Sequence, residues 1–421
     1  MQDSLKKTTR LYYGFQFFFP LLLWLPIFYE YQKRMGLDDR QIFGIQSFYY
    51  LAFFLLEIPT GYFADSWGYR QSMRLGAATL VLSTALPIFW TTYFGFLTHF
   101  VLIALARSFV SGASSAYLYE CMKAGGAEAE YKQVEGNARA YGLIGKVVCW
   151  AGVGAVMKWH ITLPYWLTLV CAVISLVYAQ RLPQQHNLPK KAWARGSRIW
   201  DGEDGEEENV FWVSRIWTEL RNYMLPVLRT LKNSPLLTLL MIQGIGIFIL
   251  GRIGQINLYQ PILESKKFDL VSYGWIMSVM TVFEAVGSAR HKWTKRVMSD
   301  INMVFALTLA IAGSLSLMAV SAKAGTFTGL IIFSYASGLA YPIQKQLLND
   351  SISDSRYRAT LLSIESLIDR GVCACVVPFI APFVSGGKLN FFLHLSALSA
   401  AVCMVILFVV IRRYHDQPLR G

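Results

Sequence analysis

The chain has 421 residues, of which 54% are apolar and 15% are charged, and its formal net charge is +13 at pH 7. A soluble protein usually carries about 25% charged residues, so this composition argues against an ordinary soluble domain. Continuous apolar runs without a two-residue alternation predict membrane-spanning helices rather than a β-barrel. Because Lys and Arg gather in loops on one side, the positive charge indicates membrane topology, and no nucleic-acid partner is predicted.

Twelve apolar segments are predicted to span the membrane. They cover residues 11–32, 41–63, 74–94, 96–119, 137–157, 161–181, 235–260, 272–291, 300–321, 326–348, 359–384 and 389–411. Pro20 and Pro26 are expected to kink the first of them. Most of the 39 Lys and Arg residues lie in loops on the side of the two termini, which predicts that both termini are cytoplasmic.

A long central loop divides the spans into six and six. The predicted domains are an N-terminal bundle (1–182), a cytoplasmic linker with an amphipathic helix (183–234) and a C-terminal bundle (235–421). Similar landmarks recur at one constant offset: Gly61 and Gly287, Arg70 and Arg296, Ser111-Gly112 and Ser337-Gly338. We therefore expect an all-α polytopic membrane protein with twelve transmembrane helices in two pseudo-symmetric six-helix bundles. This layout is typical of secondary transporters with a site between the halves.

Charged residues inside the predicted spans are the strongest functional signal. A charge near the bilayer centre costs at least about 2.5–3.5 kcal/mol, so such a group is expected to face a polar interior. The third, sixth, ninth and twelfth spans have no charge in their interiors and are expected to be peripheral. The predicted substrate-binding or proton-coupling residues are Glu30, Glu57, Arg107, Lys146, Arg252, Glu284, Glu365, Asp369 and Arg370.

Several of these charges leave two interpretations open. Arg107 and Lys146 either bind an anionic group of a substrate or neutralise nearby acids. Glu365 and Asp369 are four residues apart on one helical face, and they either take up protons reversibly or belong to a static ion-pair network. The glycines around Arg252 indicate either a broken helix at a substrate site or close helix packing.

The sequence predicts neither an enzyme nor a cofactor or metal site. The six cysteines are expected to be free thiols, and the six histidines lack metal-ligand spacing. An intramembrane enzyme or a non-transporting receptor is the alternative class, but no nucleophile and base share a depth in the spans. The predicted partners are a small-molecule substrate, protons and the lipid bilayer, and the chain is expected to act as a monomer.

The stretch GYFADSWGYR, residues 61–70, resembles the loop signature G-x-x-x-D-x-x-G-x-R of the major facilitator superfamily. With the twelve spans and the central loop, the resemblance covers nearly the whole chain. The segments EIPTG, SGASSAYLYE, YQPIL and RATLLS are similar to a bacterial branch grouped with drug:proton antiporters. The resemblance implies a cytoplasmic gate, in which Gly61 lets the second helix approach the eleventh and Asp65 accepts hydrogen bonds at the N-terminal end of the eleventh. Gly68 and Arg70 complete this gate.

Two motifs depart from that branch. The antiporter signature of the fifth helix is absent, and Lys146 lies in its place; Arg107 is followed by Ser111 and Gly112, one residue out of the expected spacing. The resemblance implies a proton-coupled secondary transporter in a bacterial inner membrane that works by alternating access and exports a small amphiphilic or anionic compound. The alternative is proton-driven uptake of an organic anion such as a metal-chelating metabolite.

Overall fold

The computed structural model describes residues 2–184, 231–232, 234–290, 298–352 and 358–415. The first half contains α1 (Gln2–Phe18), η1 (Leu25–Ile27), α2 (Phe28–Arg34), α3 (Asp39–Trp67), α4 (Tyr69–Phe89), α5 (Tyr93–Val110), α6 (Ala113–Ala124), η2 (Glu128–Glu130), α7 (Tyr131–Ala151), α8 (Val153–Trp159) and α9 (Leu163–Arg181). The second half contains α11 (Pro235–Arg252), η3 (Ile253–Asn257), α12 (Tyr259–Ser265), α13 (Leu270–Ala289), α15 (Asp300–Val320), α16 (Lys323–Ser351), α17 (Arg358–Val376), η5 (Val377–Ile380), α18 (Ala381–Ser385) and α19 (Leu389–His415).

The predicted membrane spans correspond to helices. Among the described residues, ten helices are long and apolar enough to cross a membrane, and the bent pair Glu128–Ala151 and Val153–Trp159 raises this to eleven. The first predicted span is divided into α1, η1 and α2, as its prolines lead one to expect. The prediction of an all-α polytopic fold is therefore confirmed. The predicted amphipathic helix of the linker lies outside the described residues.

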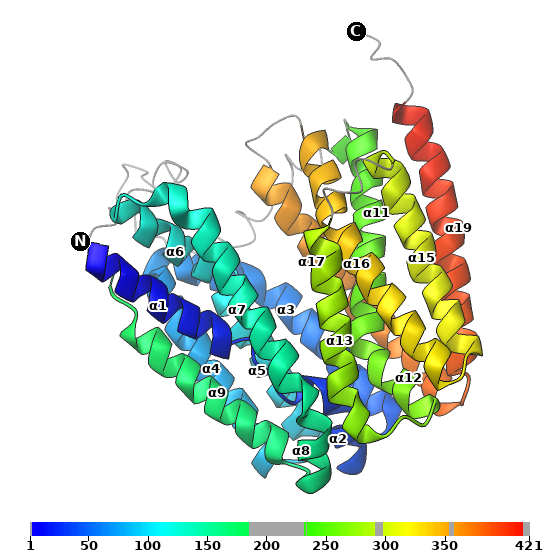
Figure 1. The fold of residues 1–421 in the computed structure, drawn as a ribbon, viewed down its shortest axis with the longest axis horizontal. Coiled ribbons are helices and arrows are strands. Elements are labelled where there is room, and N and C mark those ends of the chain that lie inside the picture. Colours follow the sequence, from blue (N-terminus) through cyan, green and yellow to red (C-terminus); the bar gives the residue numbers. More distant parts are fainter. Residues whose placement is uncertain (1, 185–230, 233, 291–297, 353–357, 416–421) are drawn as a thin grey trace, which may run out of the picture.

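The helices form two bundles that lie side by side, with both termini at the same end (Figure 1). We call α1–α9 the N-terminal bundle and α11–α19 the C-terminal bundle. The four helices without interior charges, α4, α9, α15 and α19, lie toward the outer sides of the bundles (Figure 1). In α19 only 17% of the apolar window is buried, as expected for a helix whose surface faces lipid.

The break in the first span does not leave its backbone without hydrogen bonds. The N–H of Leu23 donates to Thr168 Oγ1 at 3.0 Å, and the carbonyl of Leu22 accepts from the Trp150 indole at 2.9 Å. A membrane supplies no water for such groups, so irregular backbone is stable there only where the protein provides partners. The break is thus held by the sixth and fifth spans of the same bundle.

The two bundles contact each other at the end opposite the termini. A Cβ atom on Gly154 would overlap the carbonyl oxygen of Leu270, and one on Gly274 would overlap the carbonyl oxygen of Trp150. Small residues at helix crossings let two backbones approach closely, which is the main source of packing energy between helices in lipid. Glycine at these two positions therefore allows the tight contact between α8 and α13 and between α7 and α13.

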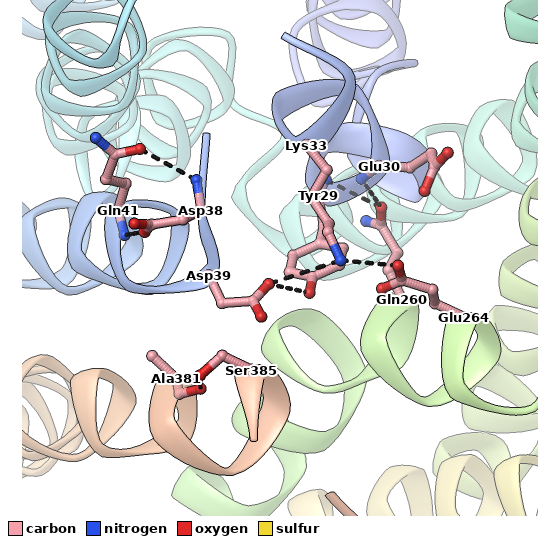
Figure 2. A network of polar contacts seen from close by, with 10 residues as sticks. All are labelled: Tyr29, Glu30, Lys33, Asp38, Asp39, Gln41, Gln260, Glu264, Ala381 and Ser385. Atoms are coloured by element: carbon pink, nitrogen blue, oxygen red, sulfur yellow. Dashed lines mark hydrogen bonds and ion pairs between the residues drawn. The ribbon is translucent and has the colours of Figure 1, made fainter. Parts of the chain in front are cut away.

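A polar network joins the bundles at the same end, as Figure 2 shows. Gln260 of α12 accepts from the N–H groups of Tyr29 (3.0 Å) and Glu30 (3.3 Å), which lie in the first turn of α2 and have no partner within that helix. Lys33 donates to Glu264 at 2.8 Å and lies 3.8 Å from Asp39. The outer lock, as we call this network, comprises Tyr29, Lys33, Asp39, Gln260 and Glu264.

Replacing Gln260 by alanine should open this end of the molecule more often, because two N–H groups of α2 lose their acceptor. We expect a membrane-impermeant thiol reagent added on this side to label a Met277→Cys variant several-fold faster in the Gln260→Ala background. Lys388→Ala, which removes an exposed lysine outside the lock, is the matched control. Equal labelling rates in the Gln260 variant and the control would contradict the role of the lock.

The same measurement should not depend on pH through Lys33. Burial lowers the pKa of Lys33, but the carboxylates of Glu264, Asp39 and Glu30 more than offset this, and the pKa lies above its ordinary value of 10.5. A raised pKa means that the ion pair contributes fully below 10.5 and is lost only as pH rises above the raised value. The labelling rate should therefore show no lysine titration between about pH 6 and about pH 8.

Candidate functional site

A cavity of about 580 Å³ lies between the two bundles. This volume falls in the usual range of about 300–1000 Å³ for sites that enclose small molecules. Much of its wall is apolar, with Phe19, Phe53, Trp150 and Met280 among the lining residues. The cavity can therefore hold a small molecule that has both an apolar part and a charged group.

Four of the predicted site residues line this cavity. Arg107 and Lys146 belong to the N-terminal bundle, and Glu284 and Arg370 belong to the C-terminal bundle. The cavity wall thus contains three cations, Arg107, Lys146 and Arg370, and one carboxylate, Glu284. The structure brings these residues together from four different helices, α5, α7, α13 and α17.

Arg107 and Lys146 have no carboxylate within the 4.0 Å of an ion pair in the part of the chain that the structure describes. Arg107 donates to the Tyr49 hydroxyl at 3.1 Å, and the Lys146 ammonium lies 5.8 Å from the centre of the Trp150 ring. A cation inside a membrane protein is costly unless it is paired. Of the two interpretations from the sequence, the geometry favours an anion-binding arrangement over neutralisation of nearby acids.

Glu57 and Arg370 lie opposite each other between the bundles. The Arg370 guanidinium is 3.9 Å from the Glu57 carboxylate, and it lies 3.5 Å from the centre of the Phe53 ring. Glu57 comes from α3 and Arg370 from α17, so this loose ion pair bridges the two bundles next to the cavity. This position suits a brace between the two helices.

A π-helical turn, η3, interrupts the seventh span directly after Arg252. Turns of this kind are frequent at functional sites because they redirect side chains. Gln255 of this turn lines the cavity and donates to Glu284 at 3.3 Å. Asn257 of the same turn contacts Gln46, and it accepts from the Tyr50 hydroxyl at 3.1 Å. The seventh span is thus continuous from Pro235 to Asn257, with a π-helical turn that contributes to the cavity. Its glycines also allow close packing, since a Cβ atom on Gly254 would overlap the Phe333 ring and one on Gly244 would overlap Gln344.

Glu365 and Asp369 each have a separate cation. Asp369 accepts from Arg252 at 2.5 Å, and Glu365 accepts from Lys345 at 2.5 Å. Both carboxylates are buried, at 2% and 0% exposure of the residue, and neither lines the cavity. Of the two interpretations from the sequence, the geometry favours the ion-pair network.

Glu30 lies on α2, apart from the predicted site residues that line the cavity. It accepts from Arg34 at 2.7 Å, four residues further along α2, next to the outer lock (Figure 2). It does not line the cavity in this structure. The expectation that Glu30 belongs with the intramembrane site residues is not supported by its position, because the break after α1 sets α2 apart as a short helix at the end opposite the termini (Figure 1).

The residues of the predicted gate lie at the end of α3 and the start of α4. Gly68 has a φ of +99°, a backbone conformation that favours glycine, and it forms the turn between these helices. Arg70 donates to the carbonyl of Gln180 at 3.2 Å, near the C-terminal end of α9, where a cation is stabilised by the helix dipole.

The close approach expected at Gly61 is not found within the part of the chain that the structure describes. Among the described residues, no atom outside its own helix lies within 4 Å of a Cβ atom built on Gly61, and Asp65 is exposed. The bundles touch at the opposite end, so the second and eleventh spans diverge here. The hydrogen bonds expected of Asp65 go to the start of the eleventh span, which follows residues 353–357. Those residues and Arg296 lie outside the described part of the chain.

Other polar residues of the site carry a weak sequence signal. Lys345 lies near the end of the predicted tenth span and is not among the predicted site residues, yet α16 continues to Ser351 and the Lys345 ammonium reaches Glu365. A search for charged residues inside the spans does not detect uncharged polar residues. Those that line the cavity are Gln16, Ser111, Ser114, Gln255, Thr281 and Ser288.

The comparisons with known proteins agree with this geometry. Residues 10–368 match the family model described as the Major Facilitator Superfamily. A comparison with curated protein sequences finds no match. Among solved structures, the nucleoside transporter NupG has a TM-score of 0.70 at 14% identity, over 98% of this chain and 100% of the other. The peptide transporter POT in complex with sulfate has a TM-score of 0.72 at 16% identity, over 98% and 94%.

These identities are low, so the two structures show a shared fold and do not indicate a substrate. The family match, in contrast, covers most of the chain. Together with the membrane-spanning helices, the two bundles and the cavity between them, it assigns the protein to a class of transporters rather than enzymes. The chain belongs to the Major Facilitator Superfamily and is a multi-pass secondary transporter of small molecules.

Proposed function

We propose that this transporter exports a small amphiphilic organic anion from a bacterial cell, in exchange for protons, across the inner membrane. The observation that supports the substrate class is the pair Arg107 and Lys146, two cations in the cavity that have no carboxylate within ion-pair distance among the described residues. The rings of Trp150 and Phe53 supply apolar contacts beside these charges. A bound anion would offset the cost of holding two cations in a low-dielectric cavity.

Glu284 is the proposed proton site. It faces the same cavity as the two cations, and its hydrogen-bond partner is the neutral Gln255. A carboxylate in this place can gain a proton without breaking a tight ion pair. Binding of a proton and of an anion would then alternate in one cavity, which is the simplest basis for coupling.

The proposed cycle moves residues 1–182 against residues 235–421, joined by the linker 183–234. Both termini are proposed to be cytoplasmic, since most Lys and Arg residues lie in loops on their side. The outer lock then lies on the external side, and this conformation is the one closed to the outside. The gate residues Asp65 and Arg70 would close the cytoplasmic side in the other conformation.

Transport into membrane vesicles tests the proposal. A thermal-shift panel of aliphatic and aromatic carboxylates first selects the acid that stabilises the purified protein most. Inside-out vesicles with an acidic lumen should then accumulate this acid, up to about tenfold for each pH unit at one proton per anion. Passive distribution of a weak acid runs the other way, toward the alkaline side, so accumulation requires the transporter.

The matched control is vesicles that contain the Arg107→Gln, Lys146→Gln double variant, which should show passive distribution alone. In right-side-out vesicles with an acidic exterior the passive distribution itself favours the lumen, so only accumulation above that of vesicles with the double variant would establish uptake of an organic anion and overturn export. Failure of every carboxylate to stabilise the protein or to be transported would overturn the anionic substrate class.

A further inference from the structure

A chain of hydrogen bonds leads from the cavity wall into the N-terminal bundle. Gln16 lines the cavity and donates its amide N–H to the Tyr12 hydroxyl at 2.8 Å. Tyr12 is fully buried and donates in turn to Glu135 Oε2 at 2.8 Å. The chain connects α1 with α7, and it lies outside the set of charged residues discussed so far.

The direction of these bonds is fixed by Glu135. Its carboxylate also accepts from the Ser115 hydroxyl at 2.9 Å and from Arg139 Nε at 3.4 Å. An ionised carboxylate only accepts hydrogen bonds, so the single O–H of Tyr12 is committed to Glu135. The Tyr12 oxygen is then left as an acceptor, and it takes the N–H of Gln16.

This arrangement determines which end of the Gln16 amide is available in the cavity. Amide groups can rotate by half a turn, and their orientation follows from the hydrogen bonds around them. With the NH₂ end held by Tyr12, the carbonyl end is the free one. A rotated amide would place two acceptors, the Gln16 carbonyl and the Tyr12 oxygen, against each other.

We infer that Gln16 selects substrates that carry a hydrogen-bond donor, such as a hydroxyl or an N–H group, in addition to the anionic group. The inference rests on the proposed function and narrows its substrate class to anions with a hydroxyl or amino substituent. Arg107 and Lys146 present donors that suit the anionic group, whereas Gln16 presents an acceptor on the same cavity wall. Tyr12 and Glu135 act as positioning residues, since neither lines the cavity.

Matched pairs of probes can separate donor recognition from charge recognition. We suggest hydroxy- and methoxy-substituted benzoates and 2-naphthoates, with the unsubstituted acids as size references, and calorimetric binding to the purified full-length protein. In each series with binding, the best hydroxy acid should bind about three- to tenfold more tightly than its methoxy partner and the parent acid. This preference should fall to about onefold in Gln16→Met and in Tyr12→Phe, which frees the amide to rotate.

Tyr13→Phe is the matched control, because it makes the same chemical change one residue away, at a ring that contacts Tyr141. It should keep the hydroxyl preference. A merely structural effect of Tyr12→Phe would weaken all probes alike and leave the ratio unchanged, and that result would overturn the inference. The Gln16→Met variant tests the same ratio without altering the buried tyrosine.

The outcomes also separate this inference from the proposed function. Carboxylates that bind in an Arg107- and Lys146-dependent way without any hydroxyl preference would overturn the role of Gln16 alone. Absence of binding for every carboxylate would overturn both.

Discussion

Replacing Arg107 and Lys146 together by glutamine should abolish saturable binding of an organic anion while the protein remains folded. A hydrogen bond to a charged group contributes about 1.5–3 kcal/mol, so each cation accounts for about a tenfold to hundredfold change in affinity. Neither cation forms an ion pair within the described residues, so their removal leaves no tightly paired carboxylate without its partner. Because no buried carboxylate among the described residues loses an ion-pair partner in the double variant, a loss of binding can be assigned to the anion site rather than to unfolding.

The measurement is equilibrium binding of the best-stabilising carboxylate to purified protein, with the thermal midpoint as the test of folding. Lys132→Gln is the matched control, since it removes one exposed positive charge outside the cavity. We expect the control to bind normally and the double variant to lose at least a hundredfold in affinity. Unchanged affinity in a folded double variant would show that the anion site lies elsewhere.

The positions of the spans could be predicted from the sequence because hydropathy acts over whole helices. A run of about 20 apolar residues must cross the bilayer whatever its neighbours are. That Arg107, Lys146 and Glu284 lie within these helices could be predicted in the same way, since it follows from their position along a span. These features depend only on the residues of one segment and not on contacts between helices, so they can be predicted from a single sequence.

The pairing of charges could not be predicted, because it depends on how each helix is rotated against its neighbours. Arg252 and Arg370 look alike in the sequence, yet Arg252 is held by Asp369 at 2.5 Å while Arg370 lies at the cavity, 3.9 Å from Glu57. The π-helical turn after Arg252 changes the rotation of the rest of that span. No hydropathy pattern reports such a turn.

The hydrogen bonds of uncharged polar residues were the second feature of the site that could not be predicted from the sequence. Gln16 can be picked out in the sequence as a polar residue within the apolar run of the first span, but the sequence does not say which groups its amide contacts. Its role follows only from its partners, Tyr12 on the same helix and Glu135 on α7. Glu135 precedes the predicted fifth span by two residues, although the structure includes it in a helix that starts at Tyr131.

The Glu284→Gln variant should lose transport driven by a pH gradient and keep binding and exchange of the anion. Glutamine has nearly the same shape and can keep the hydrogen bond with Gln255, which lies at 3.3 Å in the wild-type protein. It cannot take up or release a proton near neutral pH. If protons reach the cycle through Glu284, net accumulation should fall at least tenfold, while counterflow of labelled for unlabelled anion should stay within about twofold.

Asp369→Asn is the contrasting variant, because its carboxylate has a different environment. Asp369 is 2% exposed and holds Arg252 at 2.5 Å, so neutralising it leaves a buried guanidinium without its partner. Breaking a buried pair by removing one member costs about 3–5 kcal/mol, so this variant should lower the thermal midpoint, and Arg252→Gln added to it should restore part of the loss. Uncoupling without loss of stability is expected for Glu284 alone. A stable Asp369→Asn protein that binds the anion but no longer responds to a pH gradient would move the proton site from the cavity wall to this buried pair.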